Sequence, residues 1–275
     1  MKCPVCNKEN NKEFFSYKDI TFLYCEQCEA IYRKDYQRIN VSDLIEKVYD
    51  SKWINMRNSL VNTTFLGYSF FYNTLLNFIP EKKGKLLEIG CGTGELLYLA
   101  KSYGWKVKGI EPSKDSYNHI KKVFKDIEVI NDIWKKELLN KNEKFDVIIF
   151  VHLLEHIRNP KEFLNEVKEF LKDDGLIILG MPNGTIIDRK LNNKIKRTLI
   201  VEDHIVLYGK NTIEKLAELC NLKIRNLICH NSLEVFKVNN HLSFEDTLNK
   251  INGLIRDETT FRGNDLVVIL KKNKL

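Results

Sequence analysis

The sequence predicts a doubly wound α/β fold with a mostly parallel sheet, preceded by a small cysteine-rich unit. Three observations lead to this prediction. From Lys85 onward, short apolar runs alternate with amphipathic helical runs, which is the pattern of βαβ units. A glycine-rich turn over residues 90–94 joins the first apolar run to the first helical run. Upstream, residues 1–34 contain four cysteines in two C-x-x-C pairs.

Length and composition allow one full domain plus a small appendage, because the chain has 275 residues, 43% of them hydrophobic. The formal net charge is +7, and lysines are spread along the chain without a dense tract. Such mild basicity is compatible with nucleic acid, with an anionic small substrate or with simple solubility. No apolar run is long enough to span a membrane, and the N-terminus has no signal-peptide pattern. We therefore expect a cytoplasmic protein.

The cysteine-rich unit is predicted to be a zinc ribbon. Its ligands would be Cys3, Cys6, Cys25 and Cys28, two from each tight C-x-x-C turn. Four thiolates would close a tetrahedral zinc site without an open position, so the metal would be structural. A short segment with little core would depend on that metal for its folding energy. The alternative interpretation of the paired cysteines is a redox disulfide system.

Residues 35–84 are predicted to form a linker and helices. Apolar residues recur at helical spacing between Leu60 and Ile79, and Pro80 with Gly84 ends that run. The simplest interpretation is that these helices cover one edge of the main sheet.

The first strand of the main sheet is predicted at Leu86–Ile89, and it runs into a turn with Gly90, Gly92 and Gly94. Glycine lets the backbone adopt positive φ and approach a ligand closely, and the free N–H groups of the following helix favour an anionic group. The spacing is neither the dinucleotide fingerprint nor a P-loop. Glu88 stands just before the first glycine, which suits a ligand with a cationic part.

These residues, Glu88-Ile-Gly-Cys-Gly-Thr-Gly94, resemble motif I of the class I S-adenosylmethionine-dependent methyltransferases. That cofactor carries a sulfonium, an ammonium and a carboxylate, which fits an acid beside a glycine turn. The resemblance implies a seven-stranded Rossmann-like sheet and cofactor contacts from Glu88, Gly90, Cys91, Gly92 and Gly94. It also implies that helices of the 35–84 segment cap the pocket, where Trp53 and Arg57 would be the side chains to meet a ligand.

The second and third strands supply the next expected cofactor residues. The second strand, Trp105–Ile110, ends at Glu111-Pro112. An acid about 20 residues past the glycine turn is placed to bind ribose hydroxyls. The third strand, Ile127–Ile130, is followed by Asp132 and Ile133. The resemblance implies that Asp132 contacts the adenine amino group and that Ile133 packs on the ring, although Asp132 could equally be a helix cap.

The fourth strand, Phe145–Val151, runs into the sequence His152-Leu-Leu-Glu-His156. A helix begins at Asn159-Pro160, and a fifth strand follows at Leu176–Leu179. This block resembles the same methyltransferases. It also matches the H-x-x-E-H motif of zinc proteases, but that motif must lie within a helix, and here a strand ends at His152.

The remaining chain is less informative. Residues 184–201 are polar and basic, which is typical of a solvated face and less often of a lid over an anionic substrate. A helix is predicted at Thr212–Leu219, strands at Leu222–Ile228 and Leu266–Leu270, and a helix at Phe244–Ile255.

The predicted organisation is a zinc ribbon at residues 1–34, a helical linker and cap at 35–84 and a methyltransferase domain at 85–275. The resemblance implies methyl transfer to a small-molecule or sugar acceptor, with oxygen as the favoured acceptor atom, in surface-polysaccharide or natural-product biosynthesis. An RNA methyltransferase with a zinc-ribbon recognition module is the alternative, although no dense patch of basic and aromatic residues supports it. A third interpretation, a non-enzymatic ribbon protein with a decayed domain, conflicts with the intact glycines and acids.

Two histidines are the candidate catalytic bases. His152 follows directly on the fourth strand, and in the family the end of that strand faces the transferring methyl group. An imidazole with an unperturbed pKa of ~6.5 can accept a hydroxyl proton at neutral pH. His204 is the rival, because it lies in the segment that follows the fifth strand. The alternative for His152 is that it only packs against the cofactor and that no base is needed.

Overall fold

The computed structural model describes residues 1–17, 19–59, 72, 75–186, 203–230 and 265–273. The predicted helix over residues 244–255, most of the basic segment and most of the apolar run up to Ile79 lie outside the described residues, as does the Arg57 side chain.

The main sheet has seven strands in the order β10-β11-β8-β7-β4-β5-β6. In chain order they are β4 (Lys85–Ile89), β5 (Lys106–Ile110), β6 (Glu128–Ile130), β7 (Phe145–Val151), β8 (Leu171–Pro182), β10 (Leu222–His230) and β11 (Asp265–Lys272). Only β11 runs antiparallel, to both β8 and β10. The predicted mostly parallel seven-stranded sheet is therefore confirmed. β8 begins at Leu171 instead of Leu176, because it pairs with β7 on both sides of a register shift.

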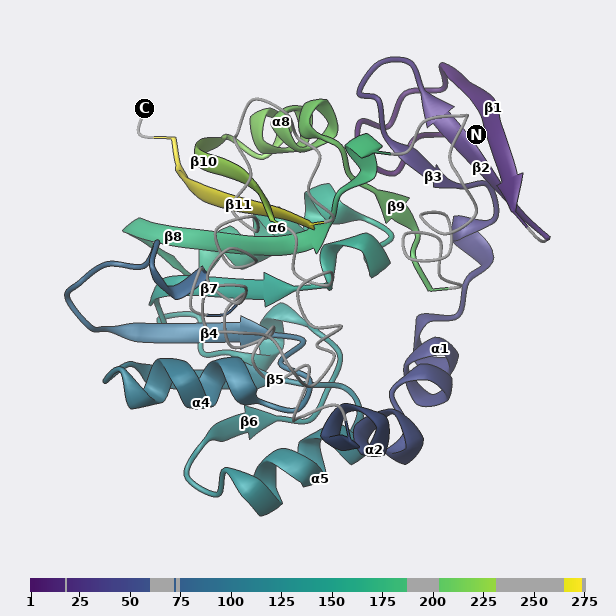
Figure 1. Ribbon diagram of the computed structural model, residues 1–275. Coiled ribbons are helices and arrows are strands. Elements are labelled where there is room, and N and C mark those ends of the chain that lie inside the picture. The colour runs from purple at the N-terminus through teal and green to yellow at the C-terminus, as the bar shows by residue number, and fades with distance from the viewer. Residues whose placement is uncertain (18, 60–71, 73–74, 187–202, 231–264, 274–275) are drawn as a thin grey trace, which may run out of the picture.

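Helices cover both faces of this sheet, as its fully buried strands require. They are α4 (Glu95–Ser102), α5 (Lys114–Val123), α6 (Pro160–Glu169) and α8 (Lys210–Leu219). Successive strand residues point to opposite faces: Val147 and Ile149 share a core with α4 and α5, whereas Ile148 and Phe150 share one with α6 and α8. Figure 1 shows α4 and α5 on the opposite side of the sheet from α6 and α8.

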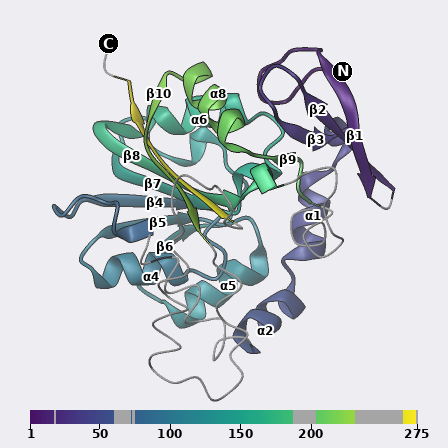
Figure 2. The ribbon, with the colours of Figure 1, turned by 45° about the horizontal axis from the view of Figure 1, so that its top comes forward.

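A second, antiparallel sheet has the order β1-β2-β3-β9. Three strands, β1 (Asn11–Tyr17), β2 (Ile20–Cys25) and β3 (Ile31–Arg33), belong to residues 1–34, which we call the cysteine module. The fourth strand, β9 (Val206–Leu207), comes from far along the chain and pairs with β3. Figures 1 and 2 both show β9 beside the module. The module is thus joined to the main domain by backbone hydrogen bonds.

Two helices, α1 (Val41–Val48) and α2 (Ser51–Ser59), follow the module. In Figure 1 they lie beyond the arrowheads of β4 and β7, which are the carboxyl ends of these strands. Short 3-10 turns complete the described structure: η1 (Tyr36–Arg38), η2 (Lys136–Leu138), η3 (Leu154–His156) and η4 (Gly184–Ile186). None of the described helices has the length and apolar character needed to cross a membrane.

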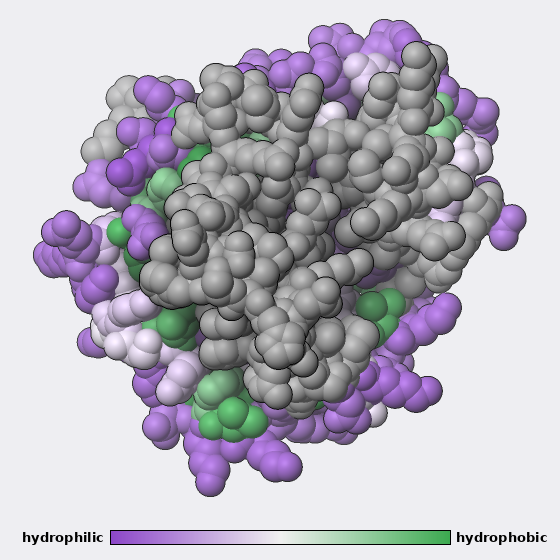
Figure 3. Space-filling model, viewed as in Figure 1, coloured by the Kyte–Doolittle hydropathy of each residue, from purple (hydrophilic) through white to green (hydrophobic). Residues whose placement is uncertain are grey.

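The surface around the described edges of the molecule is mostly hydrophilic in the view of Figure 3, and its hydrophobic patches are small and separate. The cavity described next is lined by apolar and ionisable side chains, which makes it the candidate functional site.

Candidate active site

A cavity of about 310 Å³ opens at the carboxyl ends of β4, β5 and β7, beneath α1 and α2. In open α/β sheets this is the place where ligands bind. Residues of the glycine turn and its neighbours line one part, the cofactor end: Glu88, Ile89, Gly90, Cys91, Gly92, Thr93, Glu95, Ile110, Glu111, Pro112, Ile133 and Trp134. The other part, the acceptor end, is lined chiefly by Val41, Ile45, Tyr49, Trp53, His152, His156, Ile157, Asp203 and Ile205.

The glycine turn has the backbone that its sequence predicts. Gly90, Gly92 and Gly94 all have positive φ, at 72°, 52° and 86°. Backbone N–H groups of Gly90 and Cys91 donate to the carbonyl of Ile110, at 2.8 and 3.2 Å, and tie the turn to β5. Gly94 does not line the cavity: a Cβ there would lie 3.0 Å from the Ile120 side chain of α5. This third glycine therefore serves helix packing.

Two buried acids flank the turn. Glu88 is 4% exposed and Glu111 is 5% exposed. The Glu111 carboxylate accepts the N–H groups of Gly92 at 2.7 Å and Ser113 at 2.9 Å. Burial raises the pKa of Glu111 to about 7, although these two hydrogen bonds act to lower it. Glu111 therefore changes charge near neutral pH.

The residues after β6 divide between the cavity and its surroundings. Ile133 lines the cavity and is 36% exposed, so its side chain offers an apolar surface to a flat ring. Asp132 is not among the lining residues, and its carboxylate lies 3.0 Å from Lys135 Nζ. Trp134, which was not predicted, lines the cavity and donates its indole N–H to Glu166 at 3.0 Å.

The cofactor end fits S-adenosylmethionine in its chemistry. Glu88 provides a negative charge for a cationic group, Glu111 two acceptor oxygens for hydroxyls, and Ile133 an apolar surface for a ring. Gly92 leaves space for a ligand beside the glycine turn. A Cβ at this residue would have its nearest neighbour on Trp53, 3.9 Å away.

His152 is the first residue after β7 and has a left-handed backbone with φ of 50°, which is uncommon for a residue other than glycine. Its N–H donates to the carbonyl of Gly180 at 2.7 Å. Its imidazole lies between two buried carboxylates: Nδ1 is 3.3 Å from Glu155 Oε1, and Nε2 is 3.9 Å from Asp265 Oδ1. Backbone and carboxylates together fix this ring at the wall of the cavity.

Glu155 is the centre of a histidine cluster. Burial alone would raise its pKa, but the facing His152 together with His156 and His204 outweighs burial and holds the pKa at about 2. His204 Nε2 lies 3.9 Å from Glu155 Oε1, and the His204 and His156 rings are 5.0 Å apart. His204 is not among the described residues that line the cavity, and its ring faces the Glu155 carboxylate. Possible ligand atoms of Glu155, His156 and His204 lie within 4.8 Å of one another, close enough to share a metal ion.

Aromatic and acidic residues close the acceptor end. The rings of Tyr49 and Trp53 meet edge to face with centroids 5.1 Å apart. Burial and the nearby Asp203 carboxylate raise the pKa of Tyr49. The Asp203 carbonyl in turn contacts His156 Nδ1 at 2.9 Å. Trp53 was a predicted contact, whereas Tyr49, Asp203 and Asp265 were not, because no motif marks them.

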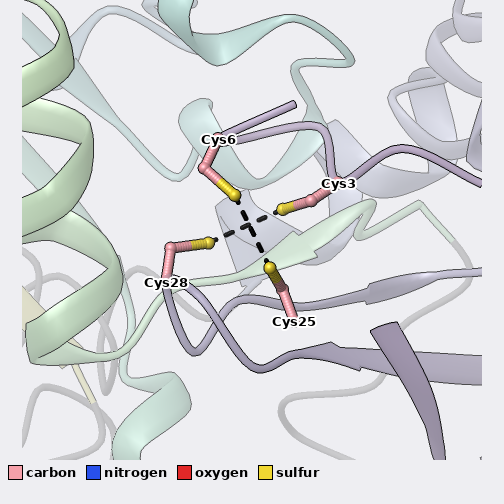
Figure 4. Close-up of side chains that lie close together, drawn as sticks. All are labelled: Cys3, Cys6, Cys25 and Cys28. Atoms are coloured by element: carbon pink, nitrogen blue, oxygen red, sulfur yellow. Dashed lines mark hydrogen bonds between the residues drawn. The ribbon is translucent and has the colours of Figure 1, made fainter. Parts of the chain in front are cut away.

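The four cysteines of the module converge, as Figure 4 shows. The Sγ atoms of Cys3 and Cys28 are 3.6 Å apart, and those of Cys6 and Cys25 are 3.5 Å apart. None of the four forms a disulfide. Sulfurs at ~2.3 Å from a tetrahedral zinc ion would be about 3.8 Å apart. The donor set and its spacing therefore fit zinc.

The two C-x-x-C turns of the module share one backbone geometry. The N–H of Asn7 donates to the Cys3 carbonyl at 2.9 Å, and that of Glu29 donates to the Cys25 carbonyl at 2.8 Å. Asn7 and Glu29 both have φ of 60°. Each turn therefore presents two sulfurs to the same point from an equivalent loop.

Comparison with known proteins gives the following similarities. The family described as Methyltransferase domain matches residues 68–227. Ubiquinone biosynthesis O-methyltransferase of Glaesserella parasuis is 34% identical over 110 residues, 37% of this chain and 46% of that protein. An uncharacterized protein of Methanocaldococcus jannaschii is 33% identical over 183 residues, 66% of this chain and 80% of that protein. The chain thus spans about half the length of the ubiquinone biosynthesis O-methyltransferases it matches.

Among solved structures, a Thermotoga maritima S-adenosylmethionine-dependent methyltransferase, described as a possible histamine N-methyltransferase, has a TM-score of 0.59 at 20% identity. The match covers 86% of this chain and all of that chain. At this identity the likeness concerns the fold.

Proposed function

Because this chain belongs to the methyltransferase domain family and is an S-adenosylmethionine-dependent methyltransferase, we propose that its acceptor is a hydroxyl group of a small molecule. S-adenosylmethionine, when bound, supplies a methyl group activated by its sulfonium. We assign its binding to Glu88, Gly90, Cys91, Gly92, Glu111, Pro112 and Ile133, which line the cofactor end. Gly94 contributes by its packing against Ile120, and Asp132, which is paired with Lys135 outside the lining, stays an expectation from the resemblance.

The observation that carries the proposal is the imidazole–carboxylate pair beside the glycine turn. His152 Nδ1 faces Glu155 at 3.3 Å, so Glu155 orients the ring and stabilises the imidazolium that forms when it takes a proton. A hydroxyl acceptor must lose a proton during methyl transfer, and His152 is the cavity-lining group placed to receive it. The names of the O-methyltransferase relatives give independent support. In this scheme His204 supports Glu155 and does not act as the base.

The lining of the acceptor end supports a small acceptor with an apolar face. Val41, Ile45, Ile157 and Ile205 contribute aliphatic surface there. Among the described lining residues, every side chain with a full charge is acidic. This composition favours a neutral or cationic acceptor over the anionic one that the basic sequence suggested.

We further propose that Cys3, Cys6, Cys25 and Cys28 hold one structural zinc ion per chain. Four sulfur ligands would leave it no open position, so it would take no part in the methyl transfer.

Transfer of labelled methyl groups tests the acceptor class. Purified protein is incubated with labelled S-adenosylmethionine and separate panels of phenols, nucleotide sugars, amines and total RNA. Label in a hydroxyl-bearing small molecule is the expected result, whereas label only in RNA or amines would overturn the proposal. With the acceptor in hand, His152→Ala should lower turnover by ~10²–10⁴-fold. His119→Ala on α5, outside the cavity lining, is the matched control.

A further inference from the structure

The cysteine module and the acceptor end are connected by a short series of backbone contacts. The last three residues of the module's sheet, Ile31–Arg33, follow directly on the second cysteine turn. The N–H of Arg33 donates to the carbonyl of Ile205 at 3.0 Å. The N–H of Ile205 donates to the carbonyl of Glu155 at 2.7 Å. One buried residue, Ile205, is thus held by the module through its C=O and by the histidine cluster through its N–H.

The residues around Ile205 belong to the acceptor end. Asp203 and Ile205 line the cavity, and His204 between them faces Glu155. Directly after them, β9 pairs with β3 through Tyr32↔Val206 and Ile31↔Leu207. This wall segment, residues 203–208, therefore has the module as its strand partner.

Side chains extend the connection. Tyr208 is fully buried, its hydroxyl donates to the carbonyl of Leu154 at 3.3 Å, and its phenol lies within electrostatic reach of Glu155 and of Cys3 and Cys28. Three of the four cysteines belong to the same continuous core as Ile205 and Tyr208. Between the sulfur cluster and the histidine cluster there is packed protein and not a solvent-filled boundary.

Among the described residues, the cofactor end has no strand pairing with the cysteine module, and it meets the N-terminal stretch at Tyr49, whose carbonyl accepts the Ser113 hydroxyl at 2.7 Å. The glycine turn and Glu111 are fixed by β4 and β5 through hydrogen bonds within the main sheet, such as Gly90 N–H to Ile110 O. The strands neighbouring β4 are β5 and β7, and the module pairs with neither.

We infer that the cysteine module is a positioning element for methyl transfer: with its metal bound, it holds residues 203–208 and the histidine cluster in their working arrangement, while cofactor binding is independent of it. The part that concerns the metal rests on the zinc proposed above. A displacement of about 1 Å at reacting groups can cost about 10²-fold in rate, so an unpaired wall segment would lower turnover steeply.

The first experiment removes the metal from the full-length protein with a chelator. Elemental analysis follows metal content, calorimetry follows S-adenosylhomocysteine affinity, and amide hydrogen exchange follows residues 203–208. We expect affinity to stay the same, exchange in this segment to speed up by about tenfold or more, and turnover to fall by about 10²-fold. Reloading with zinc should restore slow exchange and turnover. Unchanged exchange in the metal-free protein, or loss of cofactor affinity in parallel, would overturn the inference.

A second experiment breaks the backbone contact without touching a cysteine. Arg33→Pro deletes the N–H that Ile205 accepts, and Arg33→Ala loses the same side chain but keeps that N–H. The expected difference between the two is faster exchange at residues 203–208 and lower turnover in Arg33→Pro, with equal metal content and equal cofactor affinity. If the two variants behave alike, the module does not position the segment. If the purified protein holds no zinc, the metal proposal fails, yet this pair of variants still decides the positioning role.

A third variant separates metal binding from cysteine chemistry. Cys6→His keeps a zinc-compatible set of three thiolates and one imidazole, and it changes the more exposed sulfur of the first turn. It should retain both zinc and turnover, whereas Cys6→Ala should lose both. Normal turnover in a zinc-free Cys6→Ala protein would contradict the inference.

Discussion

The two ends of the cavity are built in different ways. The cofactor end comes from consecutive strand–turn units, β4, β5 and β6, whose carboxyl ends meet at one edge of a parallel sheet. The acceptor end is assembled from α1, the turn after β7, residues 203–205 and the first residue of β11. Sheet hydrogen bonds fix the first, whereas side-chain contacts and the cysteine module fix the second. A substitution in this molecule can therefore lower turnover without lowering cofactor affinity, or lower cofactor affinity alone.

The largest change in turnover is expected from Glu155→Gln at the acceptor end. The amide keeps the shape but removes the charge that faces His152, so turnover should fall by ~10²–10⁴-fold with cofactor affinity unchanged. Steady-state kinetics and calorimetry measure the two quantities. Because the pair acts as a unit, the double variant with His152→Ala should be little worse than either single variant. Additive losses would show that Glu155 does not act through His152.

The complementary change at the cofactor end is Gly90→Ala. Positive φ at this residue would strain any L side chain by roughly 1–2 kcal/mol, and the new Cβ would lie 3.3 Å from Leu153. We expect S-adenosylhomocysteine affinity to fall about tenfold, which corresponds to ~1.4 kcal/mol. Gly104→Ala is the matched control, because Gly104 also has positive φ but lies outside the cavity lining. Equal losses of affinity in both would mean that global strain is responsible.

Cofactor affinity should depend on pH through one group of the cofactor end, Glu111. Ribose hydroxyls need acceptors, so binding favours the ionised form of Glu111, whose pKa burial raises to about 7. Affinity should therefore rise with pH up to about 7, by at most tenfold per unit for one proton released, and then level off. Calorimetry in buffers of different ionisation enthalpy also measures how many protons are released when the cofactor binds. A flat profile is expected for Glu111→Gln, and the same slope in that variant would assign the proton to another group.

The stability of the cofactor-free protein should change with pH in the opposite direction to cofactor affinity. In the folded state Glu111 keeps its proton to higher pH than in the unfolded chain. Its contribution to stability is therefore present at low pH and is lost as pH rises from the unfolded pKa of ~4.3 to about 7.

The smallest effect is expected from Tyr49→Phe. This change removes the phenol oxygen that interacts with the Asp203 carboxylate and keeps the ring, so the lost interaction should be worth ~0.5–1.5 kcal/mol. Acceptor KM should rise severalfold, while cofactor affinity and kcat change little. A kcat loss as large as that of Glu155→Gln would place Tyr49 among the reacting groups instead.

Site residues whose position is determined by a short stretch of chain could be predicted from the sequence. The glycine turn, Glu111 and His152 each follow a buried strand, and parallel strands place their carboxyl ends together, so their convergence could be expected. The strands of the main sheet were found close to their predicted positions for the same reason.

The residues of the acceptor end could not be predicted from the sequence, because they meet only through tertiary contacts. Asp265 faces His152 from more than 100 residues away, and nothing in its own surroundings marks it. β9 has two residues, too few for a periodic pattern, and its partner belongs to the module. His204 was expected at the cavity, but it is not among the described lining residues, and its ring faces the Glu155 carboxylate at 3.9 Å.

The module also leads directly into the helices above the cavity. After β3 the chain passes through η1 into α1, and the Arg158 guanidinium donates to the carbonyl of Ile39 just before that helix. Residues 1–53 thus supply both a strand for one wall and the roof with Tyr49 and Trp53. In terms of protein engineering, a substitution within this stretch can alter the wall and the roof of the acceptor end together, because one continuous run of chain builds both.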